Sequence, residues 1–349
     1  MSSIWNNRIS VSIFGEAQAP AIGITIDNLP TGEYINTEEL TAFMARRSSH
    51  VMSDGYENTV PHIMSGIINE RTTGMPLCAF LQNTPKPSAP AVNDPALMRT
   101  GHADYTGAAR YKGFCDVRDS VGFSDRITLP LCFAGAICGQ ILQRRGIYAG
   151  AHILSIHNMK DNPFDPVNVG REAVLSVRKK DFPVINDRKG WVMAENLRKA
   201  AEAGETLGGI IECAAINVPA GIGSPVFDGL ENSIAQLVFG IPGVSGLEFG
   251  AGFSAARMIG SQNNDDYYVS DHGYVLTKTN NHGGILGGIS SGMPVTLRVA
   301  VKPPLLPTGA SGGAIKVSEA CSVPALVPCV EAAVNIALLS HMIDYPDFC

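Results

Sequence analysis

The sequence Ile22-Gly-Ile-Thr-Ile-Asp-Asn28, which continues as Leu-Pro-Thr-Gly32, has a counterpart later in the chain. There Ile210 to Asn217 continues as Val-Pro-Ala-Gly221. Each stretch begins with the apolar alternation of a β-strand and ends in an Asn-x-Pro-x-Gly sequence typical of a turn. Gly and Pro are common in turns, so a chance match is the alternative to an internal repeat.

Helix-start signals follow both turns. Asn36 with Glu39, and Asp228 with Glu231, have the spacing of a capping box, in which two side chains bond the backbone of the first helical turn. We therefore expect helices over 40–47 and 230–239.

Each copy then reaches a second matching segment, Thr72-Thr-Gly-Met-Pro-Leu77 in the first and Ser290-Ser-Gly-Met-Pro-Val295 in the second. From the Pro of the turn to the Gly of this segment there are 44 positions in the first copy and 73 in the second, so the second copy contains an insertion. Two matches in the same order predict a duplicated strand–helix–strand unit. Such units usually pack about a pseudo-two-fold axis, with a site where the halves meet.

Three further helices are expected, over 128–145, 193–203 and 328–343. The first is apolar on nearly every face, which indicates burial. Because strands and helices do not alternate with βαβ spacing, the pattern predicts an α+β fold with antiparallel sheets.

The composition limits the class of protein. The chain has 349 residues, of which 45% are hydrophobic and 17% charged, which excludes intrinsic disorder. Its net charge of −6 argues against a nucleic-acid partner. The N-terminus lacks a signal-peptide pattern, and the longest uncharged stretch, 127–143, is short for a membrane span. We therefore expect a cytoplasmic protein with no membrane partner.

The eight cysteines form no C-x-x-C pair. Metal-ligand spacing is absent, so we expect no metal site, and the thiols are most simply reduced core residues.

Polar residues that are able to perform chemistry gather in Arg99-Thr-Gly-His-Ala-Asp-Tyr-Thr106. Histidine exchanges protons near neutral pH, and a neighbouring Arg holds phosphate or carboxylate. An ordinary surface loop is the alternative. Asp116-Val-Arg118 and Ser124-Asp-Arg126 place two more Arg ahead of the apolar helix, where solvent-exposed Arg is the alternative.

The stretch Asn281 to Gly292 has five Gly in twelve residues. Such a stretch lets backbone approach a flat ring or a phosphate, although a tight bend between sheets explains it equally well. It fits neither the Rossmann nor the P-loop spacing. The sequence contains no nucleophile elbow, so it does not predict a Ser-His-Asp triad. We expect structural roles for the separate histidines, His62, His152, His157, His272 and His341.

Several segments together resemble the chorismate synthase family over most of the chain. They occur in the family's order and at near-family spacing. They are Phe14-Gly-Glu16, Gly101-His-Ala-Asp-Tyr-Thr106, Val218-Pro-Ala-Gly-Ile-Gly223, Pro225-Val-Phe-Asp228, Ile241-Pro-Gly-Val-Ser-Gly-Leu-Glu-Phe-Gly250, Gly260-Ser261, Asn264-Asp265, Asn281 to Gly292 and Lys302-Pro303.

The resemblance implies a cytoplasmic homotetramer of one α+β domain over 1–349, with halves at about 10–82 and 208–302. The implied fold is a pair of antiparallel sheets that are related by a pseudo-two-fold axis and sandwiched with helices. In this arrangement the sheets lie inside and the helices outside. It implies a lyase of the shikimate pathway and of aromatic amino acid biosynthesis. Family members convert a small anionic substrate, 5-enolpyruvylshikimate 3-phosphate, to chorismate by 1,4-anti elimination of phosphate. The reaction depends on reduced FMN, which is not consumed.

The resemblance also assigns roles to single positions. His102, Gln18 and Glu319 lie at catalytic positions, and Arg47, Arg99 and Arg126 lie at substrate-binding positions. The positions that contact FMN are Ser124, Gly243, Gly287 and Lys302.

The chain departs from the family pattern mostly at these positions. Gln18 replaces a second catalytic His, and Glu319 replaces a catalytic Asp. Gly122, Ser53 and Val317 stand where the family has Arg, and Pro304-Leu-Leu306 lacks the family's hydroxyls. We therefore expect FMN to bind weakly. Three interpretations follow: a lyase with a remodelled site, a paralogue acting on a different and less anionic substrate, or a non-catalytic member.

Overall fold

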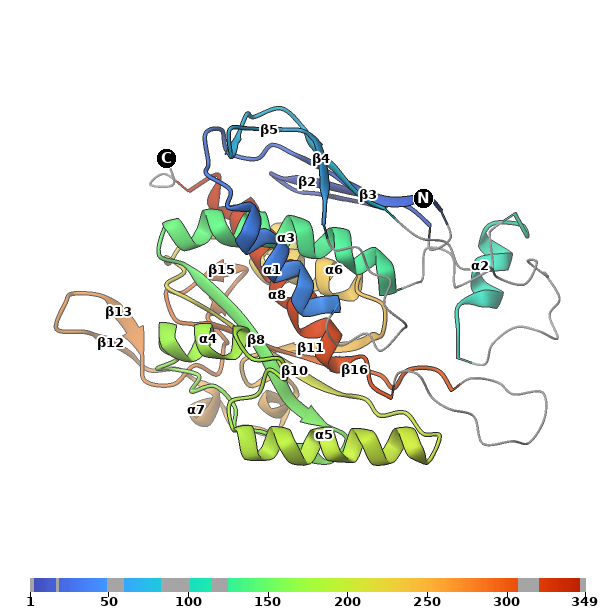
Figure 1. The fold of residues 1–349 in the computed structure, drawn as a ribbon. Helices are drawn as coiled ribbons and strands as arrows, with labels where there is room; N and C mark the ends of the chain where they lie inside the picture. Colours follow the sequence, from blue (N-terminus) through green and yellow to red (C-terminus); the bar gives the residue numbers. More distant parts are fainter. Residues whose placement is uncertain are drawn as a thin grey trace.

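The computed structural model of the chain describes residues 3–16, 19–48, 60–82, 101–114, 125–306 and 320–345. Two five-stranded antiparallel sheets form its frame (Figure 1). The first has the order β1-β2-β3-β7-β4 and the second the order β11-β16-β10-β8-β9. Their bounds are β1 Ile4–Asn6, β2 Ser10–Gly15, β3 Ala21–Asp27, β4 His62–Ser65, β7 Leu77–Gln82, β8 Tyr148–Ile156, β9 Met159–Lys160, β10 Gly209–Ile216, β11 Val244–Phe249 and β16 Val295–Val301.

Four helices fill the layer between the two sheets (Figure 1). They are α1 Thr37–Ser48, α3 Thr128–Arg144, α6 Leu230–Phe239 and α8 Val323–Met342. Helices α4 (Arg171–Arg178) and α5 (Asp187–Glu202) lie on the outer side of the second sheet. The α+β class and the pair of antiparallel sheets are confirmed. The predicted layer order is wrong: the central helices lie inside and the sheets outside.

The layer order follows from the two central helices, which are apolar on all faces. Helix α3 packs on β3 and α8, and α8 packs on β8 and β10, so both are covered on every side. They approach closely because Gly135 has no side chain: a Cβ there would lie 2.2 Å from the Cβ of Ala332. Among the described residues, α8 is the one helix long and apolar enough to cross a membrane, and every residue of it is buried inside the protein.

The helix boundaries correct two predictions. Helix α8 begins at Val323 and passes through Pro328, because burial on all sides outweighs the one backbone hydrogen bond that this proline cannot donate. Helix α5 begins at Asp187, where the side chain of Asn186 caps the backbone N–H of Arg188 at 3.0 Å. The predicted helix over 193–203 is therefore only its C-terminal part.

The two predicted capping signals have different outcomes. Asn36 caps α1, since its Oδ1 accepts from the backbone N–H of Glu38 at 2.9 Å and of Glu39 at 3.1 Å. Asp228 does not cap α6. Gly229 stands at the N-cap, and Asp228 instead forms an ion pair with Arg8.

The two turns of the predicted internal repeat have the same backbone geometry. Asn28 and Asn217 both have a left-handed backbone, with φ of 62° and 60°. The backbone N–H of Gly32 donates to Thr72 O at 2.7 Å, and that of Gly221 donates to Ser290 O at 2.9 Å. Asn tolerates positive φ better than other residues with side chains, which explains its presence in both copies.

The hydroxyl groups of Thr72 and Ser290 complete the match. Each donates to the carbonyl of the turn proline, Pro30 or Pro219, at 2.5 Å. Each also accepts a backbone N–H, from Glu33 at 2.9 Å or from Ile222 at 2.8 Å. The turns of the two copies are thus closed by the same pair of hydrogen bonds.

Small hairpins follow in both copies, and an insertion separates them from β11 in the second. The insertion contains η5, α7 and the hairpin β12–β13. The bounds are β5 Ile67–Ile68, β6 Arg71–Thr72, β14 Ile285–Leu286, β15 Ile289–Ser290, η5 Gly252–Arg257, α7 Gly260–Asn263, β12 Tyr267–Val269 and β13 Val275–Thr277. In strand order the counterpart of β2 is β8, so the second sheet also draws on residues ahead of 208. The single-domain organisation over 1–349 stays a prediction.

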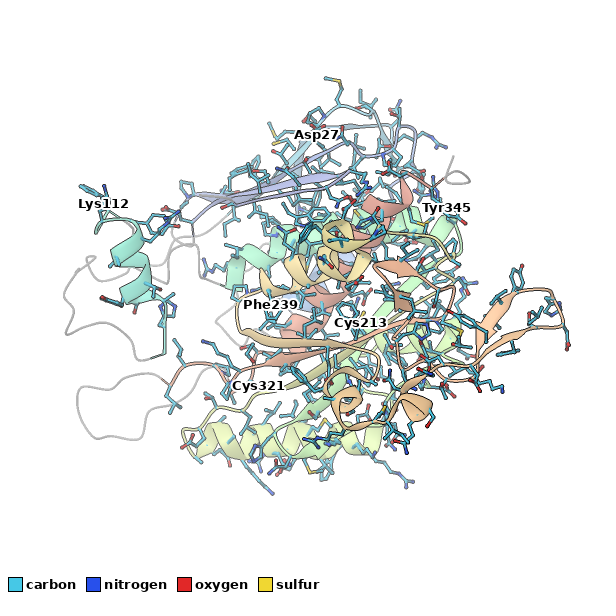
Figure 2. The ribbon with its side chains drawn as sticks, turned by 180° about the vertical axis from the view of Figure 1, so that it is seen from behind. Asp27, Lys112, Cys213, Phe239, Cys321 and Tyr345 are labelled. Carbon is cyan, nitrogen blue, oxygen red and sulfur yellow. The ribbon has the colours of Figure 1, made fainter. Side chains whose placement is uncertain are left out.

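The described cysteines are free thiols in or near the core, as predicted. Cys213 lies on β10 in the interior (Figure 2). Cys132 and Cys329 approach each other with 3.7 Å between sulfur atoms. Burial raises the pKa of the Cys132 and Cys213 thiols, which keeps them protonated and unreactive.

Candidate active site

His102 stands just before α2 (Asp104–Arg110) and is held by the first residue of that helix. Its Nδ1 lies 2.6 Å from Asp104 Oδ1, and each of the two side chains is 11% exposed. A carboxylate at this distance sets the orientation of the ring. The ring nitrogen opposite Asp104, Nε2, is the one suited to exchange a proton with a substrate.

Lys302 joins this histidine segment to the second sheet. It follows β16 directly, and its Nζ donates to the carbonyl of Gly101 at 3.4 Å. Its backbone N–H donates to Gly243 O at 2.9 Å. The structure therefore brings the segment of His102 together with Gly243 and Lys302, three positions from distant parts of the sequence.

Arg47 and Arg126 both lie near the N-terminus of α3. Arg126 lies in η3 (Asp125–Ile127), which leads into α3. Arg47, at the end of α1, is fully buried, and its Nε donates to the hydroxyl of Thr128, the first residue of α3, at 3.0 Å. Two arginines near the positive end of a helix form an environment that favours an anion.

Gly287 lies apart from the other predicted FMN positions. It belongs to the turn between β14 and β15, beside the first turn of α6, because the backbone N–H of Leu230 donates to Gly288 O at 2.9 Å. Gly243 follows the last turn of the same helix. An α-helix of ten residues is about 15 Å long, so the structure does not bring Gly287 beside Gly243.

The remaining predicted positions lie outside the described residues. They are Gln18, Arg99, Ser124 and Glu319, together with the altered positions Ser53, Gly122 and Val317. The prediction that Gln18, Arg99, His102, Arg126 and Glu319 line one cavity therefore stays a prediction.

Sequence reasoning missed two residues that hold the candidate site. Asp104 lies in the segment 99–106, where the His-x-Asp spacing is the signal that indicates its pairing with His102. Thr128 carried no such signal, because its contact with Arg47 depends on how α1 packs on α3.

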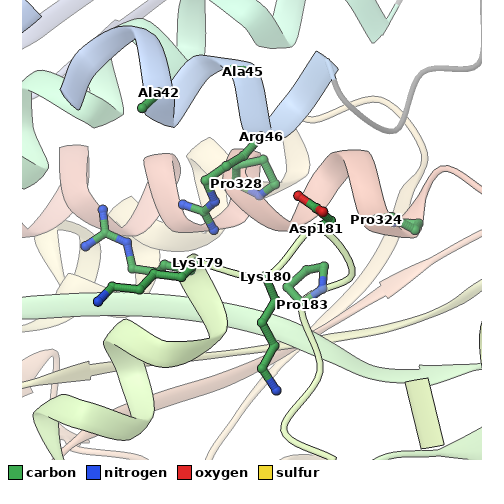
Figure 3. A pocket seen from close by; sticks show the side chains of 10 residues that line it. Ala42, Ala45, Arg46, Lys179, Lys180, Asp181, Pro183, Pro324 and Pro328 are labelled. Atoms are coloured by element: carbon green, nitrogen blue, oxygen red, sulfur yellow. The ribbon is translucent and has the colours of Figure 1, made fainter. Parts of the chain in front are cut away.

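Arg46, the neighbour of Arg47, points to a different place. It lines a pocket of about 280 Å³ between α1, the end of α4 and α8 (Figure 3). There Arg46 Nη2 lies 3.0 Å from Glu331 Oε2, and Arg178 Nε lies 2.7 Å from Glu331 Oε1. Glu331 is fully buried, so its charge holds both guanidinium groups. None of the predicted site residues that the structure describes lines this pocket.

A row of four charged residues crosses the outer face of the second sheet. His152, Glu212, Arg298 and Glu248 stand directly opposite one another on β8, β10, β16 and β11. His152 Nε2 lies 3.0 Å from Glu212 Oε2, and Arg298 Nε lies 2.9 Å from Glu248 Oε1. A pocket of about 390 Å³ lies over the middle of the row and includes Glu212, Arg298 and Phe164 in its lining.

The charge on His152 depends on its carboxylate partners. Burial alone would lower the pKa of His152, but the hydrogen bonds and charges of Asp161 and Glu212 outweigh burial and raise this pKa above its usual value.

His341 is buried on α8, and its Nε2 lies 2.8 Å from the hydroxyl oxygen of Ser233. Both histidines thus have the structural roles predicted for them. Among the described residues, no cluster of His, Cys, Asp and Glu is suited to hold a metal ion.

Comparisons with known proteins point to a single family. Residues 9–343 match the family model described as chorismate synthase. A chorismate synthase from Lancefieldella parvula is 37% identical over 99% of this chain and 97% of its own length. One from Thermococcus kodakarensis is 35% identical over 96% of each chain.

A solved structure titled as the crystal structure of chorismate synthase superposes with a TM-score of 0.77. It covers 97% of this chain and 93% of its own, at 25% identity. The chain therefore belongs to the chorismate synthase family, a family of shikimate-pathway lyases.

Proposed function

We propose that this protein converts 5-enolpyruvylshikimate 3-phosphate to chorismate by 1,4-anti elimination of phosphate, in the presence of reduced FMN. One observation carries the proposal. His102 is oriented by Asp104 at 2.6 Å and follows Gly101, whose carbonyl accepts from Lys302 Nζ, in a chain that matches the family over nearly its whole length.

The chemistry assigns roles to these groups. Phosphate leaves from an allylic carbon, so negative charge grows on the leaving oxygen and must be stabilised. His102, when protonated, donates a proton to that oxygen from Nε2, while Asp104 holds the ring by Nδ1. Arg47 and Arg126, together at the N-terminus of α3, supply positive charge for the anionic substrate.

The described residues fit part of an FMN site. Lys302 offers a cation, and Gly243 lies directly beside it with a left-handed φ of 89°. The space where a Cβ of Gly243 would project has only ordinary contacts, the nearest being Leu326 at 3.7 Å. A planar group is therefore able to approach the backbone here. When bound, reduced FMN supplies the electron flow for the loss of phosphate.

We further propose that FMN binds more weakly than in relatives with the full motifs. Gly122 and Val317 replace two cationic contacts that the resemblance implies. A hydrogen bond to a charged group contributes about 1.5–3 kcal/mol. The loss of two such contacts weakens binding by roughly two to four decades if nothing compensates.

A second function competes with the first. Gln18 is unable to exchange a proton near neutral pH, and the changes at Ser53, Gly122 and Val317 remove positive charge. These substitutions favour a paralogue that acts on a different, less anionic substrate, or a member without catalytic activity.

Substitution of His102 tests the proposal directly. His102→Ala should lower turnover of 5-enolpyruvylshikimate 3-phosphate by about two to four decades, the usual contribution of general acid–base catalysis. Gln18→His should raise turnover, because it restores a titratable group. His157→Ala, which changes an exposed histidine in a turn, is the matched control and should leave turnover unchanged.

Two results would favour the second function. One is a His102→Ala variant as fast as the parent protein. The other is a parent with no turnover in the presence of reduced FMN that Gln18→His does not rescue.

We also propose that the protein is a cytoplasmic homotetramer that binds a small anionic substrate. The outer face of the first sheet supports assembly, because Phe14 is 46% exposed there and no described helix covers it. On the edge strand β4 of the same sheet, Met64 is 67% exposed. Light scattering should give the tetramer mass, and Met64→Glu should lower that mass without changing the thermal midpoint. A parent protein that is monomeric at micromolar concentration would contradict the assembly.

A further inference from the structure

We propose that Ser291, His282 and Asp265 form a second active site, in which Ser291 is a nucleophile that hydrolyses small carboxylic esters. His282 Nε2 lies 2.9 Å from Ser291 Oγ, and His282 Nδ1 contacts Asp265 Oδ2. A hydroxyl, an imidazole and a carboxylate in this order, each bonded to the next, form the arrangement that activates serine in hydrolases.

Several hydrogen bonds hold the carboxylate of Asp265 in place, and the carboxylate in turn orients the ring of His282. It accepts the hydroxyl of Thr279 at 2.5 Å and the backbone N–H groups of Asn281 and His282 at 2.9 Å each. Burial alone would raise its pKa, but these hydrogen bonds and the one from His282 lower the pKa to about 2. The carboxylate is thus ionised at neutral pH and keeps the proton of His282 on Nδ1, leaving Nε2 to accept the proton of Ser291.

The first copy of the repeat shows that this arrangement is not required by the fold. Thr73 occupies the position of Ser291, and its hydroxyl accepts the backbone N–H of Met75 at 3.3 Å, as Ser291 accepts that of Met293 at 3.4 Å. No described histidine or carboxylate bonds the hydroxyl of Thr73. The insertion of the second copy brings Asp265 and His282 to Ser291, so the triad is an addition to a common backbone.

The surroundings of Ser291 suit a small substrate. Ser291 is partly exposed. A Cβ placed on the next residue, Gly292, would lie 3.6 Å from the Cβ of Ala220. The N–H of Gly292 donates no hydrogen bond to the described residues. In hydrolases the N–H of the residue after the nucleophile stabilises the oxyanion. Ala220, the residue nearest to that position, is small and uncharged, which favours a small uncharged ester.

The triad is separate from Lys302 and from the segment of His102, which Lys302 contacts. Ser291 precedes β16 and Lys302 follows it. Seven residues of extended strand span about 23 Å, which places the two sites at opposite ends of the strand.

The proposed step is balanced without a cofactor. Ser291 Oγ bonds to the ester carbonyl carbon while its proton moves to His282 Nε2. The carbon–oxygen bond to the alcohol then breaks, and the alcohol leaves with that proton. Water attacks the acyl-serine by the same relay, which releases the carboxylic acid and restores the hydroxyl.

Labelling with a fluorophosphonate probe tests the proposal on the full-length protein. The probe forms a phosphorus–oxygen bond with an activated serine and releases fluoride. We expect peptide mass spectrometry to find the label on Ser291, no label at this site in Ser291→Ala, and labelling at least a hundredfold slower in His282→Gln. Hydrolysis of p-nitrophenyl acetate should fall by the same factors.

Thr73→Ser is the matched control, because it places a serine on the equivalent backbone without a histidine. Residue 73 should stay unlabelled in this variant. Equal labelling of residues 73 and 291, equal rates in His282→Gln and the parent, or no label on Ser291 would each overturn the proposal. Thermal midpoints show that the variants are folded, and Asp265→Asn offers a second route to slow labelling. Lyase turnover in Ser291→Ala should match the parent, so failure of one proposal does not affect the other.

Discussion

The outer faces of the two sheets differ although their strands have the same order and register. In the second sheet, His152, Glu212, Arg298 and Glu248 form the charged row. In the first sheet, the equivalent row is Phe14, Gly23, Phe80 and His62. Phe14 lies over Gly23, where a Cβ would come within 2.2 Å of the ring, and His62 stacks on Phe80 at 5.0 Å between centroids.

This difference shows how one backbone pattern accepts two kinds of surface. The charged row is covered by the segment after β9, which supplies Asp161 and the backbone N–H of Phe164, so its charges find partners inside the protein. The aromatic row has no described cover within the chain, and Phe14 remains exposed. A buried charge needs an internal partner, whereas an exposed apolar face is suited to contact another protein.

The largest effect is expected from breaking the charged row at its buried end. Glu212→Ala leaves the charge of His152 and the backbone N–H of Phe164 without this partner. Removal of one member of a buried pair costs about 3–5 kcal/mol in the free energy of unfolding. Glu248→Ala breaks the more exposed pair of the same row, where a loss of at most about 1 kcal/mol is expected. Urea unfolding measures both, and equal effects would contradict the distinction.

The turn hydroxyls should give a smaller effect that is the same in both copies. Thr72→Ala and Ser290→Ala each remove a hydroxyl that bonds a carbonyl and an N–H of the turn. An unsatisfied buried polar group costs about 1–3 kcal/mol, so each variant should lose about 2 kcal/mol of unfolding free energy. A loss confined to one copy would show that the two turns do not support their halves equally.

The smallest effect concerns pH. The pKa of His152 is raised in the folded protein above its ordinary value of 6.5. The stabilising contribution of protonated His152 is therefore fully present below about pH 6.5. It is lost as the pH rises through the pKa that His152 has in the folded protein. The difference in thermal midpoint between the parent and His152→Gln should shrink from pH 6 to pH 9. A difference that grows with pH would contradict the charged state of His152.

Local signals in the sequence predicted much of the fold. The repeated turns were predictable because Asn, Pro and Gly have fixed backbone preferences, and α1 was predictable because Asn36 caps it by short-range bonds. The layer order was not predictable, because it depends on which helix faces contact which sheet. Asp228 failed as a cap because Arg8, far away in the sequence, bonds it instead.

The candidate sites show the same limit. His102 and Asp104 are two residues apart, so their pairing was within reach of the sequence. Lys302 beside Gly101 depends on tertiary packing, and only the family resemblance pointed to it. The contact of Asp265 with His282 depends on the inserted hairpin between them, and no spacing rule predicts it.

Titration of the purified protein with FMN, with and without 5-enolpyruvylshikimate 3-phosphate, tests the lyase assignment most directly. With the substrate present, the flavin absorption spectrum should change and saturate, at FMN concentrations above those typical of a tight flavoprotein. The reason is that Lys302 and Gly243 remain while two cationic contacts are replaced. An unchanged flavin spectrum at every FMN concentration in the presence of substrate would contradict the assignment.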